Sequence, residues 1–264
     1  ITTKEAKINN IEAFRSSCKN GHLGIAQWLH EKFHITHMEV TVDDNDIFKK
    51  SCENGHLAVA KWLYDVFHIT REEVITHDNI TFMYSYCDGH LDVVQWLYET
   101  FHITSEEAKI YDNHAFRKSC ECGYLALSKW LYETFHITPV EAKIYINQTF
   151  TMCCANGRLD VARWLYETFH ITPTEAKIIN NNEAFRKSCV NGHLNIVQWL
   201  YETFHVTYEE ATSIKNWAFH GACSYGHLEV AQWLYNTFHY TSDDASSRCF
   251  HQSCSTGHIE MAVW

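Results

Sequence analysis

A nine-residue string, WLYETFHIT, occurs at residues 96–104 and recurs without change at 130–138 and 164–172. A near-identical copy, WLYETFHVT, follows at 199–207. A catalytic pocket uses each of its residues once, so a pocket does not explain the identical copies. Repetition at a fixed period instead indicates a stack of similar units, in which each copy must fit against its neighbours.

Glycines mark the period of this repetition. Their positions are Gly21, Gly55, Gly89, Gly123, Gly157, Gly192, Gly226 and Gly257. A Trp follows each of these glycines by seven residues, and a Phe precedes each by seven. We therefore predict eight units, with the approximate boundaries 1–35, 36–69, 70–103, 104–137, 138–171, 172–206, 207–240 and 241–264. Because the chain begins on Ile1 and stops on Trp264 inside a repeated segment, we expect a single array that is truncated at both ends.

Each unit carries signals for three helices. Asn182, ten residues before the Gly, is predicted to cap the first helix with its side-chain oxygen, and Gly192 ends that helix in a left-handed turn. The second helix, at 193–204, has a broad apolar stripe. A Thr-x-x-Glu pair such as Thr172 and Glu175 then predicts a capping box and a third helix of about two turns. A Phe-His pair ends the second helix in seven units, and its imidazoles predict a pH-dependent stability.

The turn between the first two helices has a recurrent sequence, such as NGHLNIVQWLY at 191–201 and NGHLAVAKWLY at 54–64. These strings resemble the ankyrin repeat, and the chain is similar to the divergent ankyrin-like arrays common in amoebae and giant viruses. Residues 183–186 read Glu-Ala-Phe-Arg where the family has Thr-Pro-Leu-His, and His-Ile-Thr-Pro-x-Glu-Ala stands in place of its β-hairpin. We therefore expect an all-α stacked helical solenoid of about eight ankyrin-like 34-residue units, with a short third helix in place of the hairpin.

The resemblance implies protein binding without chemistry of its own. The sequence contains no phosphate-binding Gly loop, no H-E-x-x-H motif and no nucleophile elbow, so we predict that it is not an enzyme and uses no cofactor or small-molecule substrate. The formal net charge of −11 argues against a nucleic-acid partner. No apolar run approaches the roughly 18 residues that a membrane span requires, so we also predict no membrane partner.

Eleven Cys and nineteen His raise the question of metal binding. The pattern Cys-x-x-Gly-His recurs, as at Cys189 and His193, but no C-x-x-C pair occurs. Equivalent residues of stacked helices lie about 8–10 Å apart, too far to share one zinc ion or to form a disulfide. We therefore predict no metal site and reduced, buried thiols. Such thiols favour a cytoplasmic location, or one within a virus particle or other intracellular assembly.

Positions that differ between units are candidates for partner recognition, because the repeated positions build the stack. The residue nine before each Gly is the most diverse, and the two residues after each Phe also vary, as in His220-Gly221. The predicted partner-binding residues are Glu12, Asp46, Ile80, Met83, Tyr84, His114, Gln148, Glu183, Trp217 and Arg248. They lie on the first helices, whose outer face corresponds to the concave binding surface of ankyrin arrays. Trp217 is the only Trp outside the periodic column, and either a binding hot spot or local packing explains it.

Two functions remain open at this stage. The first is an interaction module or adaptor that binds another protein along its concave face, which the diversity at the Trp217 position favours. The alternative is a structural component of a larger assembly, such as a virus particle or a scaffold, which the near-identity of units three to six favours. In the third unit Tyr86 replaces a small Cys, so either the stack swells there or the site is specialised.

Overall fold

The computed structural model is all-α over the residues that it describes, and those ranges contain no strand. The described residues are 3–75, 81–82, 85–142, 145–172, 175, 182–240 and 247–264, with only the backbone described for 3–8, 43–44 and 247–248. The chain forms two compact units. Unit 1 comprises residues 1–119 and 126–136, and unit 2 comprises residues 120–125 and 137–264. Within the described ranges, no helix combines the length and the apolar character needed to cross a membrane.

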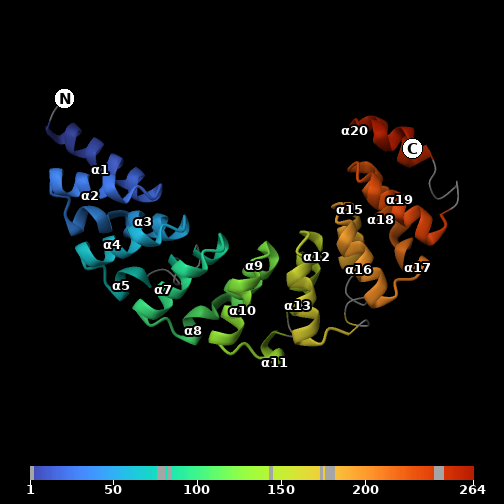
Figure 1. The fold of residues 1–264 in the computed structure, drawn as a ribbon, viewed down its shortest axis with the longest axis horizontal. Coiled ribbons are helices and arrows are strands. Elements are labelled where there is room, and N and C mark those ends of the chain that lie inside the picture. The colour runs from blue at the N-terminus through green and yellow to red at the C-terminus, as the bar shows by residue number, and fades with distance from the viewer. Residues whose placement is uncertain are drawn as a thin grey trace. The chain divides into compact units, whose positions relative to one another are not determined.

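Each repeat packs a first helix against a second helix. The first helices are α1 (Thr3–Lys19), α3 (His37–Glu53), α9 (Ile110–Cys122), α12 (Ile146–Ala155), α15 (Glu183–Val190), α18 (Ser213–Ser224) and α20 (Ser247–Thr256). The second helices are α2 (Leu23–Phe33), α4 (Leu57–Phe67), α7 (Leu91–Phe101), α10 (Leu125–Thr134), α13 (Leu159–Phe169), α16 (Leu194–Phe204), α19 (Leu228–Phe238) and α21 (Ile259–Val263). In unit 2 the helices α12, α15, α18 and α20 pack side by side in chain order (Figure 1). The predicted all-α repeat fold is therefore confirmed.

The repeated nonapeptide supplies the aromatic rings that join one repeat to the next. In unit 2 the ring of Tyr166 lies 6.0 Å from that of Trp199 and 5.4 Å from that of Phe204, both in the following repeat. Phe150 lies 6.0 Å from the same two rings and is only 1% exposed. The same contacts recur one repeat later between Tyr201, Trp233 and Phe238. The aromatic rings of each copy thus contact rings in both the preceding and the following copy. Each copy must therefore be complementary to its neighbours, which explains why the same sequence recurs.

The predicted left-handed glycine turn is confirmed, and it has a second role. Gly157 has φ 79°, and the N–H of Arg158 closes the turn by donating to the carbonyl of Cys153 at 2.9 Å. A Cβ atom added to Gly157 would lie 2.8 Å from Cε1 of His193 in the next repeat. The turn therefore requires glycine both for its backbone conformation and because an imidazole lies against it.

The His of the Gly-His turn bonds turn backbone, as predicted, but that backbone belongs to the preceding repeat. Nε2 of His193 lies 3.0 Å from the carbonyl oxygen of Ala155, and Nδ2 of Asn191 donates to the same oxygen at 2.7 Å. Burial lowers the pKa of His193 below its ordinary value, and the positive charge of Arg158 contributes to the lowering. The hydrogen bond to the Ala155 carbonyl raises the pKa of His193, but by less than burial lowers it. His193 thus packs, largely uncharged, between two repeats.

The pKa of His227 is lowered in the same way, by burial first and then by the neighbouring His193 and His258. At pH values below about 6.5, an unfolded chain binds protons at these imidazoles that the folded chain does not. We therefore expect the unfolding midpoint of the protein in urea to be lower at pH 5.5 than at pH 7.5, with the loss levelling off below the folded-state pKa values. A variant that combines His193→Gln and His227→Gln should depend less on pH over this range. An unchanged pH dependence in that variant would show that other groups cause it.

The third helix is shorter than predicted. It is represented by α5 (Arg71–Val74), α8 (Ser105–Ala108), α11 (Pro139–Ala142) and α17 (Tyr208–Ala211), each about one turn rather than two. Its capping box is confirmed. Thr104 Oγ1 accepts the N–H of Glu107 at 3.3 Å, and Glu107 Oε2 accepts the N–H of Thr104 at 2.9 Å. Burial alone would raise the pKa of Glu107, but that N–H and the guanidinium of Arg71 in the preceding repeat hold it below its ordinary value.

The predicted role of the Asn before the first helix was wrong. Asn182 stands at the N-cap of α15, but its side chain makes no capping hydrogen bond, and its φ is 64°. Asn45 is also left-handed, with φ 60°, and its Nδ2 donates to the carbonyl of Glu73 in the next repeat at 2.9 Å. Asn147 lies inside α12, whose N-cap is Tyr145. Among residues other than glycine, Asn tolerates the left-handed conformation best, so in Asn45 and Asn182 it turns the backbone rather than capping the helix.

The Phe-His pairs also end the second helices in a left-handed residue. These histidines have φ values near 50° and are exposed. They are His34, His68, His102, His136, His170, His205 and His239. Their predicted contribution to a pH-dependent stability stays a prediction.

Candidate partner-binding surface

Those predicted partner-binding residues that the structure describes lie on the first helices, and the contacts that it shows for them run to other residues. The exposed ones are Glu12, Gln148 and Trp217. The half-buried ones are Asp46, His114 and Glu183. The residues Ile80, Met83 and Tyr84, and the side chain of Arg248, lie outside the described part of the structure.

The half-buried candidates are engaged within the chain. Oδ2 of Asp46 accepts from Nη1 of Arg15, in the preceding repeat, at 2.9 Å. Oε1 of Glu183 lies 2.7 Å from Nζ of Lys187, one turn further along the same helix. Side chains that differ between repeats therefore also contribute to local contacts, and exposure separates the better candidates for partner binding from the others.

The third repeat, in which Tyr86 replaces the usual Cys, contains such a contact. The Tyr86 side chain is 1% exposed, and its ring lies 6.0 Å from that of Phe82. Its hydroxyl lies 2.8 Å from Nδ1 of His114 in the next repeat. Burial raises the pKa of Tyr86 well above its ordinary value, so the hydroxyl keeps its proton and can donate it to this nitrogen. The variable residue His114 thus pairs with the exceptional residue of the repeat before it.

Replacing Tyr86 by Phe is expected to lower the free energy of unfolding by about 1 kcal/mol, because the hydrogen bond to His114 is lost. The measurement is a double-mutant cycle in urea with Tyr86→Phe, His114→Ala and the combined variant. We expect the two changes to couple by about 0.5 kcal/mol or more. Strictly additive effects would mean that this contact contributes nothing to stability.

Trp217 combines exposure with a specific contact. Its side chain, on α18, is 38% exposed. The guanidinium carbon of Arg186, in the preceding repeat, lies 5.2 Å from the centre of the Trp217 ring, within the range of a cation–π interaction. Arg186 itself is buried. The contact holds the indole in one orientation while part of it stays accessible to a partner.

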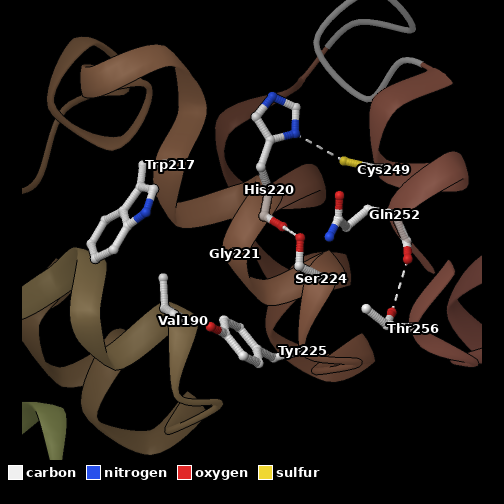
Figure 2. Close-up of a pocket in the computed structure, with 9 residues that line it drawn as sticks. All are labelled: Val190, Trp217, His220, Gly221, Ser224, Tyr225, Cys249, Gln252 and Thr256. Atoms are coloured by element: carbon white, nitrogen blue, oxygen red, sulfur yellow. Dashed lines mark hydrogen bonds between the residues drawn. The ribbon is translucent and has the colours of Figure 1, made fainter.

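Trp217 borders a cavity of about 420 Å³ in unit 2, formed by α15, α18 and α20. Its walls include Trp217, His220, Gly221, Tyr225, Cys249 and Gln252. Figure 2 shows Trp217 and Tyr225 on one side of this space and Cys249 and Gln252 on the other. A volume of this size falls within the range of about 300–1,000 Å³ that is typical of ligand pockets.

The cavity arises where the seventh repeat departs from the repeat pattern. Gly221 stands where the preceding repeat has Lys187, and a Cβ added to it would clash with Cγ2 of Val190, so glycine lets Val190 pack against the backbone at this wall of the cavity. Tyr225 replaces the Asn of the Asn-Gly pair and is 64% exposed. Neither Tyr225 nor Cys249 was among the predicted residues. The sequence did contain a signal for both residues. The position of Tyr225 is Asn in most other repeats, and the position of Cys249 is Ala, Ile or Thr in the others.

The same segment matches a known family. Residues 150–244, which begin inside α12, extend past the end of α19 and include Trp217, match the family model described as Ankyrin repeats (3 copies). No curated protein matches the chain.

Proposed function

We propose that this chain, whose residues 150–244 match the ankyrin-repeat family model, is a non-enzymatic interaction module that binds another protein along its first-helix face. Ankyrin repeats are generally protein–protein interaction modules, and the family is typically non-enzymatic. The first-helix face consists of the exposed side chains of the first helices, among them Glu12, Gln148, Trp217 and Tyr225. In ankyrin arrays it corresponds to the concave side.

The observation that carries this proposal is the pair of exposed aromatic residues, Trp217 and Tyr225, beside an open cavity. Tryptophan and tyrosine dominate the energetic hot spots of protein interfaces, especially where a neighbouring pocket accepts a side chain of the partner. The positions equivalent to Trp217 carry Glu12 in the first repeat and Gln148 in the fifth. The variation between repeats therefore produces an apolar recognition feature at one place on this face.

The exposed Glu position of the second helices is a weaker candidate, because it is identical in the copies of the nonapeptide. The exposed Glu of the nonapeptide forms a uniform series, with Glu99 and Glu133 in unit 1 and Glu167 and Glu202 in unit 2. A partner that binds one particular part of the array needs differences between repeats. The same acidic residue in each copy provides no such difference.

The free thiols support an intracellular site of action. All eleven cysteines lie among the described residues and are present as thiols rather than disulfides, and most of them are buried. Persistent free thiols are typical of reducing compartments. We therefore place the proposed interaction in the cytoplasm or inside an intracellular assembly.

The test is affinity capture from the native source, followed by mass spectrometry of the captured proteins. The variant combines Trp217→Ala with Tyr225→Ala, and a matched control combines Glu167→Ala with Glu202→Ala on the second-helix face. We expect one discrete protein to be retained by the native chain and the control, and to bind the aromatic variant about 30-fold more weakly or not at all. Recovery of the same set of assembly proteins by all three would instead indicate a structural component of a larger assembly, such as a virus particle or a scaffold. Helical circular dichroism shows that each variant is folded.

A further inference from the structure

A thiol and an imidazole lie within hydrogen-bonding distance in the wall of the Trp217 cavity. Nδ1 of His220, on α18, is 3.1 Å from Sγ of Cys249, on α20 (Figure 2). The two residues belong to successive repeats, so the packing of those repeats brings them together. Cys249 is 7% exposed and lines the cavity, which gives small molecules a route to its sulfur.

Cys249 differs in its surroundings from the periodic cysteines. Cys189 and Cys223 occupy the repeated position three residues before the Gly of the turn, and both are fully buried. Burial raises the pKa of Cys189 far above the ordinary thiol value, so that residue packs as a small apolar side chain. Cys249 instead occupies the position before the Phe, where other repeats have residues such as Ala218 and Thr149. The repeat pattern therefore does not explain why a cysteine stands at position 249.

A second, fully buried thiol contacts Cys249. Cys223 forms a hydrogen bond with Cys249, and this bond, followed by burial, raises the pKa of Cys223. Cys223 thus keeps its proton and can donate it to a negatively charged sulfur at Cys249. Together, an imidazole that can take up a proton and a thiol that donates a hydrogen bond favour the thiolate form, which is the nucleophilic form of cysteine.

We propose that Cys249 is a site of covalent modification by small α,β-unsaturated carbonyl compounds that enter the cavity, with His220 as its proton acceptor. The sulfur forms a bond to the β-carbon of the electrophile as the carbon–carbon double bond opens. The thiol proton, held by His220, is then delivered to the α-carbon. Atoms and electrons balance without an oxidant or a leaving group. The side chain of Gln252, in the same wall, is placed to donate a hydrogen bond to the carbonyl oxygen of such a compound.

The test measures how the rate of modification by acrylamide depends on pH, with each cysteine followed by peptide mass spectrometry. Cys254 is an internal reference, because it lies on the same helix and is exposed. An ordinary thiol loses reactivity by about 200-fold between pH 9 and pH 6, in proportion to its thiolate fraction. For Cys249 we expect a loss of less than about tenfold over the same range. Comparing each cysteine with itself removes the effect of its different accessibility.

Two variants separate activation by His220 from other causes. His220→Gln should give Cys249 the loss of about 200-fold that is expected of an ordinary thiol. His251→Gln, which changes an exposed histidine on the same helix as Cys249, should leave the Cys249 profile unchanged. Parallel profiles for Cys249 and Cys254 in the native chain would overturn the proposal, and so would a His220→Gln variant that is folded, as judged by circular dichroism, and reacts like the native chain. No partner protein is needed, so the result does not depend on the proposed function.

Discussion

Replacing Phe150 by alanine is expected to lower the free energy of unfolding by about 3–5 kcal/mol, the usual cost of removing a fully buried aromatic ring. Phe150 is 1% exposed, and its ring lies 6.0 Å from the rings of Trp199 and Phe204 in the next repeat. The change therefore opens a cavity at a junction between repeats as well as removing apolar area. Urea denaturation followed by far-ultraviolet circular dichroism measures the loss.

Phe250 provides a matched control for this change. It occupies the same position of its own repeat, seven residues before the Gly, but it is 61% exposed. Phe250→Ala should therefore cost less than about 1 kcal/mol. Equal losses for Phe150→Ala and Phe250→Ala would mean that the packing between repeats is not the source of the stability of the Phe column.

Replacing Gly157 by alanine is the second change with a large expected effect. Its φ of 79° costs a residue with a Cβ about 1–2 kcal/mol. The new methyl group would also lie 2.8 Å from Cε1 of His193, so the imidazole must move away from its position beside the Ala155 carbonyl. We expect a total loss of about 2 kcal/mol or more, measured as a lower urea midpoint.

The control is Gly24→Ala, within the second helix α2. No atom lies within 4 Å of a Cβ added at Gly24. Alanine favours a helix interior over glycine by about 0.5–1 kcal/mol, so this variant should be slightly more stable than the native chain. Opposite signs for the two changes are the expected result. A loss of stability in both variants would mean that the turn glycines are retained for a reason other than their conformation and the contact with histidine.

The local parts of this fold were predictable from the sequence because their signals lie within a few residues. The capping box of Thr104 and Glu107 and the left-handed turn at Gly157 both act over three or four positions, and both predictions are confirmed. The Asn before the first helix was misread, because Asn serves equally well as a helix cap and as a left-handed residue. Asn182, with φ 64°, has the second role and turns the backbone immediately before α15.

The candidate site was only partly predictable. Trp217 was identified because it occupies the most diverse position of the repeat and is the only Trp outside the periodic column, and it is indeed exposed. The cavity beside it was not foreseen, since its walls combine residues of three successive repeats, among them Val190, Gly221 and Cys249. Likewise, the variability of His114 predicted a role in partner binding, whereas the structure pairs it with Tyr86. Sequence variation identifies the positions that the repeat pattern does not constrain. Only the packing shows which of these side chains are exposed and which contact other residues of the chain.

The most direct test of the proposed protein-binding role is site-specific photo-crosslinking in the native source. A benzophenone amino acid is placed either at Gln148 or Tyr225, on the first-helix face, or at Glu167 or Glu202, on the second-helix face. We predict that the two first-helix positions crosslink to one and the same protein and that the two second-helix positions do not. Crosslinks from the second-helix positions to regular assembly neighbours, with none from Gln148 or Tyr225, would contradict the proposed role and make the chain a building block of a larger structure.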